Sequence, residues 1–465
     1  MSFTQLEFAI FLVLVLATAW ACRRRTTRNA TLLFASYYFY AYWDLRFCSL
    51  LLLSTVVDYW VARAIQHHSD ERVRRRWLLL SVVVNLGTLG FFKYCNFFLN
   101  TARPIAESLG LNVATLSIIL PVGISFYTFQ TLSYTIDVYR RRIRATHHWL
   151  DFALYVSFFP QLVAGPIVRA RSLLPQLQQV PPFSARRFYG GLQLLLRGAV
   201  KKILIADRLA ETVDWVFQAP ELYHPTTLWL ALFAYAGQIY YDFSGYSDMA
   251  CGIAKLLGYR FPINFRHPYL AKSPQEFWRR WHITLSTWLR DYLFIPLGGS
   301  RGSRFQTFRN LMLTMMLGGL WHGAAMTFVL WGAWHGLALC VGRWFHLTDS
   351  QLCPKRLRDP LGWALTMTLV LSGWLVFRSP DLSSALRYAR GLVALESGPL
   401  FWMPPLTILG LFLMMVDHVA WTTRLRIAMR LPVHTWYAPT ITVFLLWCLL
   451  IYAPRGFQPF VYFQF

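Results

Sequence analysis

Two histidines lie in a stretch of the chain that is otherwise almost entirely apolar, residues 318–336. His322 and His335 each stand in a Trp-His-Gly triplet. A neutral imidazole can accept a proton near physiological pH, which suits a general base. Ionisable side chains inside a membrane segment usually face a cavity or a partner. For His322, position alone leaves two interpretations open: a general base, or a core histidine bonded to a backbone carbonyl.

His335 follows on the same apolar stretch, and we interpret it mainly as structural. On a continuous helix it would lie about 220° around the axis from His322, so the two rings would not share a face. The HExxH spacing of helical zinc sites is also absent. We therefore expect no metal and no bound cofactor. A position of His335 on the lining of a substrate tunnel remains open.

Residues 273–299, "SPQEFWRRWHITLSTWLRDYLFIPLGG", hold a second histidine beside charged side chains. Arg279 and Arg280 precede His282 closely, and guanidinium groups bind phosphates well, so the pair is a candidate site for a phosphate-bearing donor. The alternative is an interfacial helix with snorkelling arginines, which the spacing alone favours.

A third polar group occurs in "YYDFSGYSDMA", residues 240–250. Tyr246, Ser247 and Asp248 are candidates for the lining of a polar funnel. Ser247 or Asp248 can equally act as the N-cap of a helix that begins there. The sequence does not decide between the two.

The elements that hold these side chains are predicted to be membrane helices. Hydrophobic residues make up 56% of the 465 residues and charged residues only 14%, as in polytopic membrane proteins. The net charge is +24. The basic residues lie in loops between apolar runs, as expected of cytoplasmic loops that can also contact anionic lipids. We expect no nucleic-acid partner.

Positive charge also predicts the orientation. "RRR" at 23–25 directly follows the first apolar run, which places that end in the cytoplasm and the N-terminus outside. The plainest predicted spans are 4–22, 30–46, 48–66, 77–98, 114–138, 362–378, 403–422 and 436–453.

The middle of the chain is less regular. Residues 158–169 are too short and too broken by proline and glycine to span, and we expect a re-entrant or interfacial segment. Residues 186–209 predict a helix lying in the membrane surface. The positive-inside rule places both ends of 227–258 in the cytoplasm. This predicts a pair of helices with a break at "YDFSGYSD". It likewise predicts a break near "GGLWHG" within 310–346. The total is ten to twelve transmembrane helices in one all-α domain.

Six motifs taken together resemble one known family. They are "PVGISFYTFQTLSYTIDVYR" (121–140), "DFSGYSDMA" (242–250), "EFWRRWHITLSTWLRDYLFIPLGG" (276–299), "GGLWHGA" (318–324), "LWGAWHG" (330–336) and "PFVYFQF" (459–465). As a set they resemble the membrane-bound O-acyltransferases, nearest to the bacterial branch that O-acetylates alginate and to its cellulose-acetylating relative. The resemblance covers essentially the whole chain, as a single domain with N-terminal spans (1–140), a catalytic core (141–346) and C-terminal spans (347–465).

The resemblance implies a site and an activity. His322 matches the catalytic histidine, and His282 matches a second functional histidine. The fold would enclose a central tunnel. Acetyl-CoA or another acyl thioester would donate an acetyl group on the cytoplasmic side of the bacterial inner membrane, for O-acetylation of an exopolysaccharide. Periplasmic acetyltransferase or hydrolase-like proteins, within a polysaccharide biosynthesis complex, would complete the transfer. D-alanyl transfer to teichoic acids and membrane transport are the alternatives.

One position departs from the alginate branch. That branch has an asparagine three residues after the catalytic histidine, where this chain has Ala325. If the asparagine orients the histidine or binds substrate, another residue must do so here.

Overall fold

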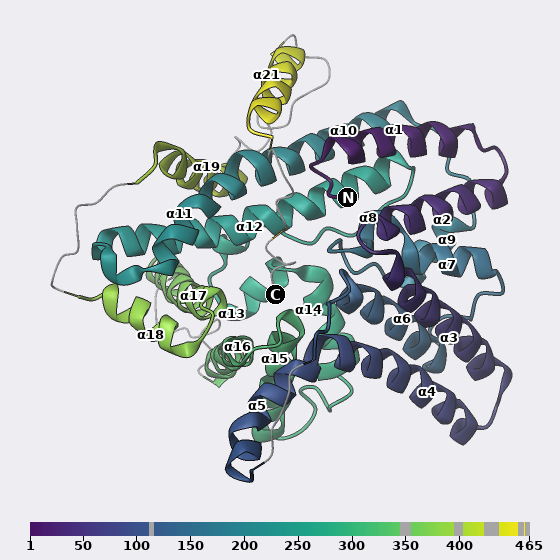
Figure 1. The fold of residues 1–465 in the computed structure, drawn as a ribbon, viewed down its shortest axis with the longest axis horizontal. Coiled ribbons are helices and arrows are strands. Elements are labelled where there is room, and N and C mark those ends of the chain that lie inside the picture. The colour runs from purple at the N-terminus through teal and green to yellow at the C-terminus, as the bar shows by residue number, and fades with distance from the viewer. Residues whose placement is uncertain (111–115, 345–354, 395–402, 423–436, 454–459, 461–465) are drawn as a thin grey trace. The chain divides into compact units, whose positions relative to one another are not determined.

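The computed structural model describes residues 1–110, 116–344, 355–394, 403–422, 437–453 and 460 (Figure 1). Within these residues every regular element is a helix. The predicted all-α class is therefore confirmed for the described chain.

Three helical stretches among the described residues are long and apolar enough to cross a bilayer: Leu45–His67, Glu71–Ser108 and Leu357–Arg378. They contain the predicted spans 48–66, 77–98 and 362–378. Shorter apolar helices cover Leu6–Ala21, Pro405–Ala420 and Ala438–Ile451. These helices support a membrane protein, because soluble domains rarely present so many long apolar helices.

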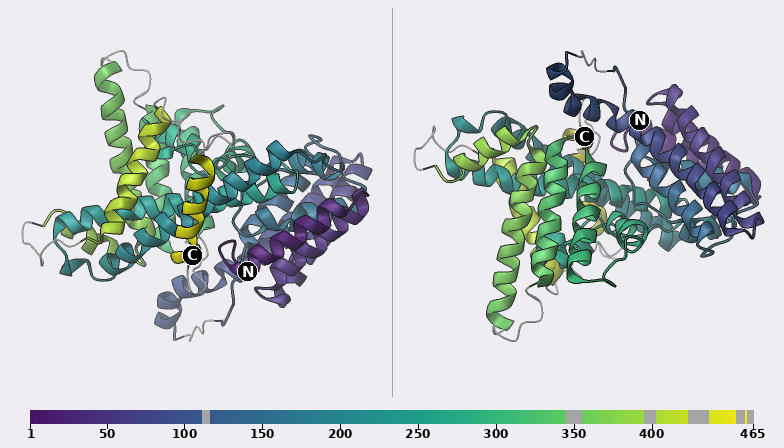
Figure 2. Two further views of the ribbon diagram at one scale, coloured as in Figure 1. Left: turned by 90° about the horizontal axis from the view of Figure 1, so that it is seen from above. Right: turned by 90° about the horizontal axis from the view of Figure 1, so that it is seen from below.

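The chain divides into two compact units, the first formed by Met1–Leu195 and Met249–Pro262. Figure 2 shows its purple N-terminal helices lying side by side with roughly parallel axes. Its helices are α1 (Leu6–Ala21), α2 (Arg25–Ala41), α3 (Cys48–His67), α4 (Glu71–Leu89), α5 (Cys95–Ser108), α6 (Ile124–Tyr139), α7 (Trp149–Ser157), α8 (Phe159–Leu162), α9 (Ala170–Leu177) and most of α10 (Ala185–Ala199), with a 3-10 turn at Leu45–Phe47 and a π-helical turn at Gly90–Tyr94.

A buried carboxylate joins α3, α4 and α6. Asp58 is fully buried and accepts hydrogen bonds from Asn85 (2.8 Å), Thr135 (3.0 Å) and Ser81. A buried charge costs free energy unless hydrogen bonds satisfy it, and here polar groups from both neighbouring helices do so. The network therefore fixes the rotation of the three helices against one another.

The predicted span 114–138 differs from the structure at its start. α6 begins only at Ile124, after Gly123 with a positive φ of 78°. A side chain at Gly123 would collide with the carbonyl oxygen of Leu162, 2.6 Å from the position of a Cβ. Almost every residue of α6 is buried, so α6 is enclosed by protein within the first unit.

The second unit is formed by Leu196–Asp248 and Ile263–Phe465. A π-helical turn, Val200–Ala206, connects α10 to α11 (Asp207–Gln218). The other elements are α12 (Pro225–Leu256, whose last turns belong to the first unit), α13 (Pro274–Arg280), α14 (Ile283–Leu289), a π-helical turn at Arg290–Phe294, α15 (Arg304–His322), α16 (Met326–Trp344), α17 (Lys355–Arg378), α18 (Leu382–Gly391), α19 (Pro405–Thr422) and α21 (Tyr437–Ile451), with 3-10 turns at Pro220–Leu222 and Pro268–Leu270.

The predicted break within 227–258 is wrong, because α12 runs unbroken through "YDFSGYSD". Gly245 permits close packing there, since a Cβ would lie 2.9 Å from the carbonyl oxygen of Gly198. The two aspartates of the motif are neutralised by cations of the neighbouring helical segment: Asp242 by Lys202 at 2.5 Å, and Asp248 by Lys201 at 2.8 Å. Paired charges can stay inside a continuous helix.

The predicted break within 310–346 is confirmed. α15 ends at His322 and α16 starts at Met326, and the two helices pack along their length (Figure 1). Glycines make this contact possible: a Cβ at Gly319 would lie 2.1 Å from the carbonyl oxygen of Phe328, and one at Gly332 would lie 2.3 Å from that of Met315. Small residues let helix backbones approach closely in membrane proteins.

Candidate active site

His322 is the last residue of α15, where the chain leaves the helix. The next residue, Gly323, is extended (φ −158°, ψ 151°). A side chain at Gly323 would collide with the ring of Phe328, because a Cβ there would lie 2.1 Å from a ring carbon. The glycine of the Trp-His-Gly triplet thus allows the turn that presents the imidazole at a helix end.

Aromatic rings surround His322. Its ring centroid lies 5.0 Å from that of Trp321, 5.1 Å from Trp331 and 5.6 Å from Phe377, each at a steep interplanar angle. Edge-to-face packing of this kind is favourable and directional. The residue is 4% exposed, so packing fixes the plane of the imidazole.

His282 is fully buried between α13 and α14. Its backbone is left-handed (φ 39°, ψ 54°), which is uncommon for any residue but glycine. Such a conformation persists only where the surroundings determine it, and it is often found at functional sites. The ring packs edge to face against Phe243, with centroids 4.6 Å apart.

Asn264 determines the tautomer of His282. The backbone N–H of Thr284 donates to Asn264 Oδ1 (3.2 Å), so this side-chain atom must be the oxygen of the amide. His282 Nδ1 lies 3.1 Å from the same oxygen and therefore carries the proton. In the neutral ring the basic lone pair is then on Nε2.

The structure brings the two predicted catalytic histidines together. The ring centroids of His282 and His322 are 6.4 Å apart, with an interplanar angle of 58°. Proton transfer requires hydrogen-bond reach, directly or through one water. Two imidazoles at this separation can act on one small reacting group.

The two predicted donor-binding arginines differ in their surroundings. Arg280 forms an ion pair with Glu276 (2.6 Å) and donates to the carbonyl oxygen of Arg266 (3.2 Å). Arg279 is exposed. A surface guanidinium is the more accessible of the two for a phosphate.

The polar residues of 240–250 lie in the interior of α12, so the N-cap interpretation of Ser247 and Asp248 is wrong. Asp248 accepts from Arg197 at 2.8 Å as well as from Lys201. Ser247 Oγ accepts from Asn264 Nδ2 (3.2 Å), which links α12 to His282. The ring of Tyr246 packs on Phe460, with centroids 4.6 Å apart.

His335 lies on α16 and is fully buried among aromatic rings. It stacks on Phe277 (6.0 Å, 11°) and contacts the edges of Trp278 and Trp331 at 5.3 and 4.9 Å. Neither ring nitrogen has a hydrogen-bond partner among the described residues. This packing favours the structural interpretation, which stays a prediction.

Sequence reasoning missed two groups in this unit. One is Asn264, a single asparagine in the loop after α12, whose partners are distant in sequence. The other is Lys202, whose buried ammonium contacts Asp207 (2.9 Å) and Asp242 (2.5 Å). The signal for the second was available, since a lysine within an apolar run requires a buried anion.

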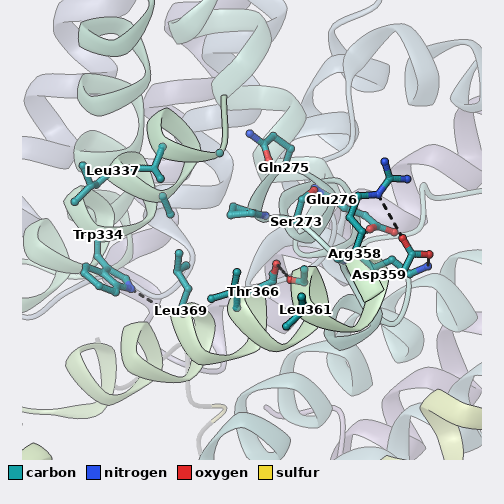
Figure 3. A pocket seen from close by; sticks show the side chains of 17 residues that line it. Ser273, Gln275, Glu276, Trp334, Leu337, Arg358, Asp359, Leu361, Thr366 and Leu369 are labelled. Carbon is teal, nitrogen blue, oxygen red and sulfur yellow. Dashed lines mark hydrogen bonds and ion pairs between the residues drawn. The ribbon is translucent and has the colours of Figure 1, made fainter. Parts of the chain in front are cut away.

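A separate cavity of about 600 Å³ lies beside α13, α16 and α17 (Figure 3). Its wall is largely apolar, with Trp334, Leu337 and Leu369 among the lining residues. At one end Lys272 pairs with Asp359 at 2.6 Å. Neither His282 nor His322 lines this cavity.

Ionisable side chains inside membrane proteins often mark functional sites, so the buried histidine pair is the candidate active site of this all-helical chain with membrane-length apolar helices. Residues 32–372 match the model of the membrane-bound O-acyltransferase family. The chain belongs to this family.

Individual relatives agree with this assignment. The chain is 46% identical over 364 residues to the probable alginate O-acetylase AlgI of Pseudomonas aeruginosa, covering 77% of this chain and 68% of that protein. It is 39% identical over 398 residues to the peptidoglycan O-acetyltransferase of Helicobacter pylori, covering 78% and 73%. It is 28% identical over 216 residues to the teichoic acid D-alanyltransferase of Bacillus subtilis, covering 44% and 54%. The predicted family and the predicted enzyme class, a membrane-bound O-acetyltransferase, are confirmed.

Proposed function

We propose that this chain takes an acetyl group from acetyl-CoA or another acyl thioester at the cytoplasmic face of the bacterial inner membrane and passes it outward for O-acetylation of an exopolysaccharide. Alginate is the first candidate polymer and cellulose the second. The similarity to an alginate O-acetylase over most of both chains supports the first. The 6.4 Å separation of the His282 and His322 rings is the observation that carries the proposal.

In the proposed reaction His322 is the general base. One of its ring nitrogens takes the proton of the acceptor hydroxyl as the oxygen attacks the thioester carbonyl. The new C–O bond forms, the C–S bond breaks, and the departing thiolate takes from the His322 imidazolium the proton that it had accepted from the hydroxyl. General-base help of this kind is typically worth about 10²–10⁴ in rate. Attack by His322 itself, through an acetyl-histidine intermediate, is the alternative route.

His282 is the second functional histidine in this proposal. With Nδ1–H held by Asn264, its Nε2 can bind the donor or share the proton that His322 accepts. The support lies in three contacts on one amide oxygen, from His282, Thr284 N and Thr284 Oγ1. The asparagine of the alginate branch instead follows the histidine that matches His322, at the position where this chain has Ala325.

The route of the substrates follows from the same proposal. A tunnel between the two faces, within ten to twelve spans and with a periplasmic N-terminus, would admit the donor from the cytoplasm. Exposed Arg279 would bind the donor phosphates. Periplasmic acetyltransferase or hydrolase-like partners, in a polysaccharide biosynthesis complex, would complete the transfer. The apolar wall of the cavity in Figure 3 suits the tail of a membrane lipid.

The experiment is complementation of a strain that lacks its own copy of this gene. His322→Ala and His282→Ala chains should insert at normal levels and leave the polymer unacetylated, whereas His224→Ala, a control at a half-buried loop histidine, should restore acetylation. Acetyl content of the purified polymer is the measurement. Normal acetylation with His322→Ala would refute the assignment.

The same strain separates the alternatives. Alanine esters on teichoic acid would indicate D-alanyl transfer, and acetylated peptidoglycan would indicate another acceptor, since relatives with those names match as well. Solute flux into proteoliposomes, without any acetyl donor, would indicate a transporter.

A further inference from the structure

Three side chains far apart in the sequence meet in the second unit, away from the histidine pair. His267 lies in the loop between α12 and α13, and Asp417 and His418 lie near the end of α19. One ligand atom from each falls within 4.8 Å of the others. Asp417 Oδ2 is 3.5 Å from His267 Nδ1, close to the separation of roughly 3.3 Å between ligands of a tetrahedral zinc ion.

The hydrogen bonding of His418 prepares it for a metal. Its Nδ1 lies 3.0 Å from the carbonyl oxygen of Met414 and 3.8 Å from Asp417 Oδ2. The carbonyl contact places the proton on Nδ1 and the lone pair on Nε2. The residue is 6% exposed, and Nε2 has no hydrogen-bond partner in the described part of the chain. Metal-binding histidines commonly donate their second N–H to a backbone carbonyl, and a buried lone pair without a donor is otherwise costly.

The neighbours of the cluster hold it in place. The rings of His267 and His418 lie edge to face, 5.2 Å apart. His418 also stacks on Tyr269 at 5.7 Å. Tyr241 Oη donates to Asp417 Oδ2 (3.3 Å), the outer hydrogen bond that a metal-binding carboxylate usually has.

The local charge suits a dication. Two neutral imidazoles and one carboxylate leave a single negative charge for the ion to offset. Lys201, whose ammonium lies over the Tyr240 ring, pairs with Asp248 at 2.8 Å, and Arg197 pairs with the same carboxylate at 2.8 Å, so these three groups together keep one positive charge.

We propose that His267, Asp417 and His418 bind one Zn²⁺ ion. Two imidazoles and one carboxylate form a common zinc ligand set, with the fourth position left to water. The ion ties α19 to the loop that carries Asn264, three residues before His267, and so supports the backbone that orients His282. This binding does not depend on the proposed acetyl transfer.

The test is the zinc content of the full-length chain. The protein is purified in detergent with a histidine-free tag, loaded with zinc sulfate, dialysed against metal-free buffer and measured by plasma mass spectrometry. We expect about one zinc per chain for the unmodified protein and below about a tenth for His267→Ala and His418→Ala. His224→Ala, a histidine of the same unit outside the cluster, should keep the full content.

Two further measurements keep the test decisive. If His418→Ala fails to fold, Asp417→Asn and His267→Gln are measured in its place. His267 is only half-buried, so its replacement should disturb the fold less. Cobalt loading should give the visible absorption of a tetrahedral site, and His267→Gln should abolish it. Equal zinc in the unmodified chain and the variants, or less than about a tenth of an ion in the unmodified chain, overturns the proposal.

Discussion

Asn264 joins His282 to α12: its carboxamide oxygen accepts from the imidazole at 3.1 Å, and its NH₂ donates to Ser247 at 3.2 Å. Asn264 is itself 2% exposed and His282 is fully buried. The orientation and the tautomer of the histidine therefore depend on a residue outside all six motifs that resemble the family.

Replacing Asn264 should slow catalysis without preventing insertion. We expect Asn264→Ala to lower kcat about 10- to 100-fold, the usual cost of removing an orienting hydrogen bond, with little change in KM. Ser247→Ala removes only the outer bond and should keep most of the activity. Acetyl transfer by the detergent-solubilised protein is the measurement, and equal losses in the two variants would contradict this role for Asn264.

α15 and α16 pack so closely at Gly332 that a side chain at this position should not fit. A Cβ there lies 2.3 Å from a backbone oxygen of Met315, so the helices must separate and carry His322 with them. We expect Gly332→Ala to cost about 1–3 kcal/mol, as overpacking does, and to reduce activity.

The matched control is Gly87→Ala on α4, where no atom lies within 4 Å of the added Cβ. Since alanine favours helix over glycine, this variant should be as stable as the unmodified chain or slightly more so. Thermal unfolding in detergent compares the two. A Gly332→Ala chain as stable as the control would show that the contact is not tight.

Loss of the Lys202 ammonium should destabilise the second unit. Lys202, Asp207 and Asp242 have side chains only 3%, 9% and 2% exposed. Lys202→Met leaves two buried carboxylates uncompensated, and removing one partner of a buried pair typically costs about 3–5 kcal/mol.

A triple variant, Lys202→Met with Asp207→Asn and Asp242→Asn, should recover much of that stability, because it removes the charges together. Chemical denaturation of the purified proteins is the comparison. If the triple variant were no more stable than Lys202→Met, the charges of Asp207 and Asp242 would not be the cause of the instability of Lys202→Met.

Donor affinity should depend more on Arg279 than on Arg280. We expect Arg279→Gln to raise KM for the thioester donor several-fold with kcat retained. Arg280→Gln should change KM less, because its guanidinium is occupied by Glu276. Steady-state kinetics with varied donor concentration separates the two. A larger KM effect for Arg280→Gln would reverse the assignment.

Much of the site was predictable from the sequence, because its signals are local. The distribution of positive charge predicted a helix break near "GGLWHG", and a histidine between glycines in an apolar run predicted an ionisable group inside the protein. The whole set of motifs predicted the family. Close approach of α15 to α16 follows from the same glycines.

The features that the sequence did not predict involve side chains whose partners are distant in the sequence. Positive charge that placed both ends of 227–258 in the cytoplasm suggested a helix pair broken at "YDFSGYSD", a motif that holds two aspartates. Lys202 and Lys201 compensate them, and nothing near the motif indicates that. Asn264 and the His267, Asp417 and His418 cluster were missed for the same reason, because each becomes informative only beside partners distant in the chain.

The most direct test of the catalytic assignment is single-turnover acetyl transfer by purified His322→Gln with a labelled thioester donor and a hydroxyl acceptor. We expect a rate lower by about 10²-fold or more, with donor binding unchanged. A rate within about twofold of the unmodified enzyme would show that His322 does not act on the reacting groups.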